Sequence, residues 1–379
     1  MKEVIKKSFS KKYLQSLETP VFLYLHSQTQ QNIEDFKIFA ENDIEILYAI
    51  KASNHPKLIK AFVKEGYGFE VASVEELKFL IENGADAKRI SCSATSKLVK
   101  DLKWASKVGV QYYAFDSEEE IKKIVKNVKN PKLIARISTP SKESAFDLSS
   151  KYGMDDKYYE YILKQAVKNK WPIKGLTFHV GSQNPDLKAW KGSLAKMEYL
   201  IDMTKSFGLE VDYLNLGGGI PVPYEKGIKH VSYYNDGICK LVKNLRKKYK
   251  FKKVFIEPGR ALSANTAIMV AEVTDIKPYK KPPLVVLDTS VFGGLIEPLE
   301  HFEYPLYGLE QIYGKGEKTE LRYFKIGGYS CDGYDIIHRY IALPKNVAVG
   351  DKIIVSYAGA YTFVFVGFHM KPYPNILDF

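Results

Sequence analysis

The stretch EILYAIKASNHPKLIKAFVKEGYGFEVASVEELKFLIENG, residues 45–84, contains one pattern twice. Each copy begins with a short apolar run and continues with a longer segment whose apolar residues recur every three or four positions. The short run is typical of a buried strand, and the longer segment is typical of an amphipathic helix. Gly66 and Gly84 follow the two helical segments, where glycine commonly ends a helix. The stretch therefore predicts two successive strand–helix units.

The same alternation continues to residue 260, with helical patterns between the strand-like runs. The eight runs are EILYAI (45–50), YGFEVAS (67–73), RISCSAT (89–95), QYYAFDS (111–117), KLIARIS (132–138), GLTFHVGS (175–182), YLNLGGG (213–219) and KVFIEPGR (253–260). Eight strands that alternate with helices predict a (β/α)8 barrel of the TIM type. A doubly wound parallel sheet is the alternative.

The chain changes character after residue 265. Runs such as AIMVAEVTDIK, LRYFKIGG and YTFVFVGFH read as strands, and no long helical pattern separates them. This texture predicts an all-β domain of the Greek-key or β-sandwich type. We therefore expect a barrel over residues 20–265 and a β domain over residues 266–379, which residues 1–19 can join.

The composition is that of a soluble globular protein, with 45% hydrophobic and 26% charged residues. The net charge is +12, but the lysines lie between acidic residues and accompany no nucleic-acid-binding motif, so we expect no nucleic-acid partner. The chain has no apolar run of about 18 residues and no apolar signal segment near Met1. Its three cysteines are far apart and give no disulfide or zinc spacing. We expect a cytoplasmic protein without a membrane partner or a metal.

Unusual polar residues and glycines gather at the ends of the predicted strands. Lys51 ends the first strand, His179 ends the sixth, glycines 217–219 end the seventh, and Glu257 and Arg260 end the eighth. Each has a structural explanation when it is taken singly, such as a tight turn, a hydrogen-bonded core histidine or a local ion pair. Because the active site of a barrel enzyme lies at the carboxyl ends of its strands, these positions together predict one active-site mouth.

The residue types at this mouth suit pyridoxal phosphate. Gly217, Gly218, Gly219 and Arg260 offer backbone N–H groups and a cation to the phosphate. The amine of Lys51 can condense with the cofactor aldehyde, and the imidazole of His179 can lie against the ring. Glu257 then faces the pyridine nitrogen and keeps it protonated, so that the ring can accept the electron pair released when a bond to Cα breaks.

The motifs YAIKAS, FHVGSQ, LNLGGGIP, EPGRA, CDGYD and GAYT occur in this order between about residues 20 and 370. In this order they resemble the eukaryotic-type ornithine decarboxylase family. This fold-type III group also contains diaminopimelate decarboxylases and biosynthetic arginine decarboxylases. The resemblance implies a pyridoxal-phosphate enzyme, built as a homodimer of barrel-plus-β-domain subunits that share their active sites.

The resemblance also implies roles for further residues. Ser182, Gly259 and Tyr361 would complete the cofactor site. Glu70 would lie near the cofactor lysine, where the family usually has Asp. Cys331 and Asp332 would enter from the partner subunit, the former to reprotonate Cα after CO₂ leaves and the latter to hold the distal amine of a diamino acid.

The segment VFGGLIEPLEHFEYPL, residues 291–306, departs from the family pattern. Ornithine decarboxylases end the corresponding segment in an Asp that shares the distal ammonium. Here that position falls near His301, with Glu297 and Glu300 as nearby acids. The predicted reaction is decarboxylation of a basic L-amino acid such as ornithine or lysine, or of an N-substituted diamino acid, to an amine and CO₂.

Several alternatives stay open at this point. The pathway can be that of polyamines, siderophores or peptides. A diaminopimelate-type decarboxylase is the nearest alternative enzyme, although that group usually carries CESGD where this chain has CDGYD. A racemase is less favoured, because alanine racemases place Arg opposite the pyridine nitrogen. A silent homologue that regulates a partner is the alternative outside catalysis.

Overall fold

The computed structural model describes residues 1–139, 150–225, 227–300, 302–314, 320–365 and 368–370. The chain forms two compact units, which we describe separately. The barrel unit comprises Gln31–Pro223, Ile228–Ala261 and Gly367–Phe379, and the β unit comprises Met1–Gln30, Tyr224–Gly227 and Leu262–Val366.

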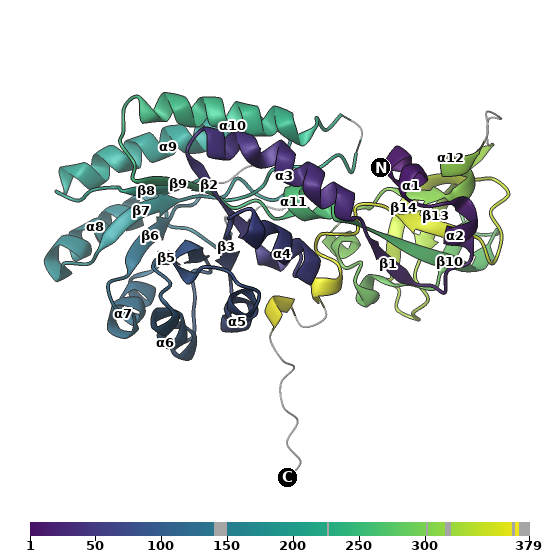
Figure 1. Cartoon of the computed structure of the whole chain (residues 1–379), viewed down its shortest axis with the longest axis horizontal. Helices are drawn as coiled ribbons and strands as arrows, with labels where there is room; N and C mark the ends of the chain where they lie inside the picture. The colour runs from purple at the N-terminus through teal and green to yellow at the C-terminus, as the bar shows by residue number, and fades with distance from the viewer. Residues whose placement is uncertain (140–149, 226, 301, 315–319, 366–367, 371–379) are drawn as a thin grey trace, which may run out of the picture. The chain divides into compact units, whose positions relative to one another are not determined.

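The barrel unit is built on eight parallel strands that close on themselves (Figure 1). In chain order they are β2 (Ile44–Ala49), β3 (Gly68–Val71), β4 (Ile90–Cys92), β5 (Tyr112–Phe115), β6 (Lys132–Arg136), β7 (Ile173–Thr177), β8 (Tyr213–Asn215) and β9 (Lys253–Ile256). β9 pairs with β2 in parallel register and closes the ring. The predicted (β/α)8 barrel is confirmed, and the doubly wound alternative is wrong because its sheet would stay open.

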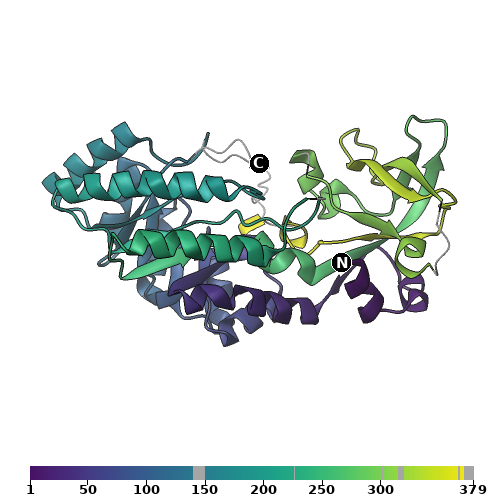
Figure 2. The same ribbon diagram turned by 90° about the horizontal axis from the view of Figure 1, so that it is seen from above.

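Helices follow the strands and cover the outside of the barrel (Figure 1). They are α4 (Pro56–Lys64), α5 (Val74–Glu82), α6 (Val99–Val108), α7 (Glu118–Asn127), α8 (Asp156–Asn169), α9 (Leu187–Ser206) and α10 (Val231–Arg246), and α3 (His26–Glu41) precedes β2. Ser73 and Ser117 cap α5 and α7, because their hydroxyls accept hydrogen bonds from backbone N–H groups of the first turn. The long helices α9 and α10 run side by side (Figure 2).

Aromatic side chains fill the interior of the barrel at the start of its strands. Tyr112 and Tyr213 are the first residues of β5 and β8, and their rings meet at 5.3 Å. The ring of Phe255 lies 5.1 Å from that of Tyr112. Leu47 and Ile134 complete this buried cluster. The part of the barrel that this cluster fills is therefore a packed core. An active site is expected at the carboxyl ends of the strands.

The β unit is a sheet in the order β12-β15-β10-β11-β13-β14, with β1 also paired to β10. Its strands are β1 (Val21–Tyr24), β10 (Ala267–Lys277), β11 (Leu284–Leu287), β12 (Leu306–Gly308), β13 (Leu321–Gly327), β14 (Ile336–Pro344) and β15 (Lys352–Val355). The short helices α1 (Lys2–Ser8), α2 (Lys11–Gln15) and α12 (Leu309–Tyr313) pack on this sheet through apolar residues such as Ile5 and Leu14. The predicted second domain is present, but it is mostly sheet and not all-β, because these three short helices pack on it.

Strand pairing and hydrogen bonds, and not position in the sequence, decide which unit the segments near the two ends of the chain belong to. β1 lies within the expected barrel range, but its antiparallel pairing with β10 gives Val21–Tyr24 to the β unit. At the other end, His369 hydrogen-bonds to Ser73 and Glu76 and belongs to the barrel unit. Among the described residues no helix is both long and apolar enough to span a membrane.

Candidate active site

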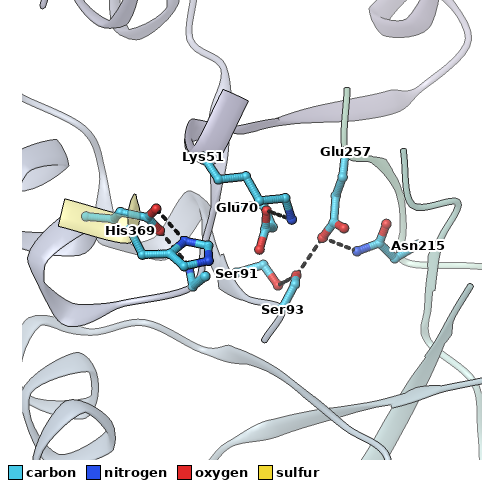
Figure 3. Close-up of polar contacts among 9 residues, drawn as sticks. Lys51, Glu70, Ser91, Ser93, Asn215, Glu257 and His369 are labelled. Carbon is cyan, nitrogen blue, oxygen red and sulfur yellow. Dashed lines mark hydrogen bonds and ion pairs between the residues drawn. The ribbon is translucent and has the colours of Figure 1, made fainter. Parts of the chain in front are cut away.

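Lys51 stands just beyond the end of β2, in the short 3₁₀ turn η1 (Ile50–Ala52). Its Nζ lies 2.9 Å from Oε2 of Glu70, which comes from β3 (Figure 3). Glu70 is only 2% exposed, whereas the lysine side chain is 34% exposed. A buried carboxylate is costly without a cation, so the ion pair holds the partly exposed lysine against Glu70 in the barrel mouth.

The three glycines after β8 occupy backbone positions that leave no room for a side chain. A Cβ on Gly217 would lie 2.0 Å from the Phe178 carbonyl oxygen. On Gly218 it would lie 2.6 Å from the Glu257 carbonyl oxygen, and on Gly219 it would lie 2.3 Å from a backbone oxygen as well. Gly217 and Gly219 also have φ values of +62° and +109°. The triplet therefore lets this loop pass closer to its neighbours than any side chain would allow, and we call its backbone the glycine surface.

Arg260 adds a buried cation beside this surface. It is the first residue of α11 (Arg260–Ser263) and is 5% exposed. Its Nη2 donates to Ser182 Oγ at 3.2 Å. Ser182 follows Gly181, whose carbonyl is the oxygen that a side chain on Gly219 would strike. A guanidinium keeps its charge even when it is buried, so the glycines and Arg260 fit a phosphate group.

Glu257 lies at the end of β9 and is held through one of its two oxygens. Oε1 accepts hydrogen bonds from Ser93 Oγ at 2.6 Å and from Asn215 Nδ2 at 2.7 Å (Figure 3). Within the described residues, Oε2 accepts no hydrogen bond. Burial raises the pKa of Glu257 and the charge of Glu70 raises it further, whereas the two hydrogen bonds lower it. The open oxygen fits a protonated ring nitrogen as its partner.

His179 follows β7 and is neutral. Its Nδ1 accepts a hydrogen bond from the Gly181 N–H at 2.9 Å, so the ring proton sits on Nε2. Burial, with smaller contributions from the charges of Arg136 and Lys51, lowers its pKa to about 3. A neutral imidazole at this position suits packing against a flat aromatic ring, the role predicted for it.

Two residues that the sequence did not indicate also serve this mouth. Arg136 ends β6 and packs on the ring of Tyr152 at 4.6 Å. Burial lowers its pKa, and the charges of Glu257 and Asp116 are the largest effects that oppose this. A cation at the end of an apolar run was the signal that singled out Lys51, and the run KLIARIS carried the same signal.

His369 is the second residue that the sequence did not indicate. Its Nδ1 lies 2.9 Å from Glu76 Oε1, and its carbonyl oxygen accepts from Ser73 Oγ at 2.6 Å (Figure 3). The other oxygen of Glu76 accepts from the Ala72 N–H at 2.7 Å, which braces the turn just after the strand of Glu70. Nothing in the sequence near His369 indicates this contact, because it joins residues almost 300 positions apart.

Apart from Gly259, the remaining predicted residues lie in the β unit. Cys331 and Asp332 are exposed on the loop between β13 and β14. Asp332 Oδ1 accepts from the Tyr334 N–H at 2.7 Å, so the loop itself orients this carboxylate. Asp335 is buried and accepts hydrogen bonds from Ser290 Oγ and from two backbone N–H groups. It therefore ties this loop to the segment after β11.

The acids predicted for the substrate side chain differ in their surroundings. Glu297 is 5% exposed and lies 3.4 Å from the Tyr304 hydroxyl, whereas Glu300 is exposed. His301 lies outside the described residues. Tyr361 is partly exposed, with φ of +52°, and its carbonyl oxygen accepts from the Tyr304 hydroxyl at 3.5 Å. Gly259 lies between the strand end and Arg260.

Comparison with known proteins agrees with this geometry. Residues 26–264 match the family described as "Pyridoxal-dependent decarboxylase, pyridoxal binding domain". The lysine/ornithine decarboxylase of Selenomonas ruminantium is 30% identical, over 86% of this chain and 82% of that protein. Antizyme inhibitor 2 of Homo sapiens is 29% identical, over 83% of this chain and 71% of its own length. The crystal structure of lysine decarboxylase from Selenomonas ruminantium superposes with a TM-score of 0.81 at 28% identity, covering 95% of this chain and 94% of that one.

The chain belongs to the family of pyridoxal-dependent decarboxylases. It is an amino-acid decarboxylase with pyridoxal phosphate as its cofactor, as the sequence predicted. The close backbone at the glycine surface, the buried Arg260 and the open oxygen of Glu257 fit that cofactor.

We expect Lys51 to be the residue that bonds to the cofactor. Borohydride reduction of the protein loaded with pyridoxal phosphate, followed by peptide mapping, should place the label on Lys51. Lys97 is an internal control, because it is a buried lysine whose Nζ is bound by the Ala94 and Ala114 carbonyls and pairs with Glu120. A label on Lys97, or one that persists in Lys51→Ala, would contradict the assignment.

The glycine surface predicts a steric effect. In Gly218→Ala the new Cβ meets the backbone at Glu257, so the loop or the strand end must move. The displaced backbone would no longer fit the phosphate, so pyridoxal phosphate should bind about tenfold more weakly in a fluorescence titration, a loss of about 1.4 kcal/mol of binding free energy. Gly192→Ala is the matched control, because a Cβ there meets nothing within 4 Å. Equal affinities in the two variants would show that Gly218 is not part of the phosphate site.

Proposed function

We propose that this protein decarboxylates a basic L-amino acid to an amine and CO₂, as a homodimer whose active sites combine residues of both subunits. The observation that carries the proposal is the grouping of Lys51 with Glu70, and of Glu257 with an open oxygen, at one barrel mouth. One residue can bond the cofactor and the other can pair with its ring nitrogen. This is the arrangement that decarboxylation at Cα requires.

Each residue then has a distinct task. The bound cofactor supplies an electron sink for the pair left on Cα when the bond to the carboxylate breaks. Glu257 keeps the ring nitrogen protonated through Oε2, and the neutral ring of His179 packs against the cofactor. The thiol of Cys331 delivers the proton that replaces CO₂ on Cα. The product amine therefore keeps the side chain of the substrate.

The substrate class is inferred from the carboxylates of the β unit. Asp332 is exposed and oriented by its own loop, and Glu300 is the exposed acid of the segment that departs from the family pattern. Asp335 ties the start of that segment to the loop of Asp332. A desolvated carboxylate is stabilised by a distal ammonium or guanidinium and not by a neutral side chain. Glu297 is less favoured as an acceptor, because it is buried beside Tyr304.

In this proposal Asp332 and Glu300 limit the length of the substrate side chain, and lysine or ornithine supplies the distal ammonium that a carboxylate favours. The Selenomonas relative is named for both amino acids, which supports the same class. A diaminopimelate-type activity is the alternative within decarboxylation. A regulatory role without catalysis has the resemblance to antizyme inhibitor 2 in its favour. The pairing of Lys51 with Glu70 at the mouth favours catalysis over that role.

We expect CO₂ release from lysine or ornithine, and Asp332→Ala to lower kcat/KM for that substrate strongly. In the proposed dimer the bound substrate desolvates Asp332, and loss of such a polar partner can cost a factor of up to about 10⁴. The assay compares ornithine, lysine, arginine and diaminopimelate with the wild type and the variant. Diaminopimelate as the preferred substrate would refute the ornithine-like pocket, and no release from any of them would favour the regulatory role.

Asp335→Ala is the matched comparison within the same motif. It removes a buried acceptor of three hydrogen bonds, so it should lower the melting temperature, and the loss of stability should reach about 3 kcal/mol. Asp332→Ala should leave the melting temperature and the affinity for pyridoxal phosphate unchanged. If both variants lost stability equally, the effect of Asp332 on turnover would be structural.

The shared sites predict complementation. Lys51→Ala and Cys331→Ala should each be inactive, because each removes a group from every site. Random mixing of equal amounts puts half of the subunit pairs into mixed dimers, and each mixed dimer has one intact site of two. About a quarter of the wild-type activity should therefore return, measured as CO₂ release after subunit exchange. Exchange without recovery would show that each site is built within one chain.

A further inference from the structure

Asn215 contacts both halves of the cofactor site with one side chain. It ends β8 and is 4% exposed. Its Oδ1 accepts from the Gly217 N–H at 2.9 Å, and its Nδ2 donates to Glu257 Oε1 at 2.7 Å (Figure 3). The first contact reaches the phosphate surface and the second reaches the carboxylate for the ring nitrogen. We infer that Asn215 is a positioning residue that couples these two parts of the site.

The orientation of this amide follows from its neighbours. The Gly217 N–H can only donate, so the amide oxygen must face it, and the NH₂ group is then turned toward Glu257. Among side chains of this length, only an amide carries an acceptor and a donor together. An aspartate could accept from Gly217 but could donate to Glu257 only when protonated, and leucine could do neither.

Ser93 is the second donor to the same oxygen of Glu257. Its hydroxyl lies 2.6 Å from Oε1, and Ser91 Oγ lies 3.0 Å behind it (Figure 3). An ionised carboxylate only accepts hydrogen bonds, so the Ser93 hydroxyl donates a hydrogen bond to Glu257. The Ser91 hydroxyl then donates one to Ser93. Two donors on Oε1 leave Oε2 as the oxygen that faces the cofactor. They also favour the ionised carboxylate against burial and the charge of Glu70.

This inference rests on the cofactor and on the proposed roles of Glu257 and the glycines, but not on the substrate. It predicts that the two contacts of Asn215 can be separated by experiment. Removing the contact to Gly217 should weaken phosphate binding. Removing a donor from Glu257 should raise the pH below which the carboxylate becomes protonated, because a hydrogen bond to the charged form is lost.

The test compares pyridoxal phosphate with pyridoxal, which lacks the phosphate. Both are titrated into Ser93→Ala, Asn215→Ala and Asn215→Asp, and the visible absorbance of the bound cofactor is followed as the pH falls. All three variants should shift the midpoint of the acid transition upward, by about one pH unit for Ser93→Ala and Asn215→Ala, the scale of one hydrogen bond to a charged group. Asn215→Asp should shift it further, because it adds a carboxylate beside Glu257. Only Asn215→Ala should also lower the preference for the phosphorylated form, by about tenfold.

Asn235→Ala is the matched control, because Asn235 is a fully buried amide in α10 that donates to the Asp35 carbonyl, away from the cofactor residues. Asn235→Ala should lower the melting temperature. It should change neither the preference for pyridoxal phosphate over pyridoxal nor the midpoint of the acid transition. If Asn215→Ala does not fold, Asn215→Asp and Ser93→Ala still test the contact to Glu257. The inference is wrong if both leave the midpoint unchanged, or if Asn235→Ala shifts it equally. These measurements need no turnover, so they stand even if no basic amino acid is decarboxylated.

Discussion

The pairing of β2 with β9 is the constraint on which the active site depends. Ile44 to Ile46 align with Val254 to Ile256, and beyond them the Ala49 N–H donates to the Pro258 carbonyl. The first and last barrel strands therefore end side by side, although they are some 200 residues apart in the chain. Closure of the barrel brings Lys51 and Glu257 to the same end of the barrel. The buried aromatic cluster fills the barrel interior beneath them.

The mouth holds two acids, Glu70 and Glu257, whose negative charges repel each other. Their hydrogen-bond and ion-pair partners differ, and this gives the two acids different roles. Glu70 is buried and is neutralised by Lys51, so it serves the lysine. Glu257 receives two neutral donors on one oxygen and no cation from a described ion pair, so its other oxygen can meet a cation brought by a ligand. The two buried carboxylates therefore differ in what they can still bind. Glu70 is paired with a cation, whereas Glu257 is held by two neutral hydrogen-bond donors.

The sequence predicted the barrel and the chemistry of its mouth because both are written in local patterns. Strand ends, the glycine triplet and Lys51 are each visible within a few residues, and their convergence follows from the parallel barrel. Asn215 and Ser93 were missed, since an amide or a hydroxyl at a strand end is common and acquires meaning only beside Glu257. His369 was missed because its contact spans most of the chain. The pairing of β1 with β10 was missed for the same reason, because the two strands are far apart in the sequence.

The CDGYD motif shows why motif residues need their surroundings before a role is assigned. Both aspartates lie in one loop, but Asp335 is buried under three hydrogen bonds while Asp332 is exposed and accepts from a single nearby N–H. The first fixes where the loop stands relative to the segment after β11, and the second is left to meet a ligand. The glycine at 328 belongs to the same arrangement, because a Cβ there would lie 2.3 Å from the Asp335 carboxylate. If Asp332 holds the substrate as proposed, its position depends on the buried Asp335, which fixes the loop.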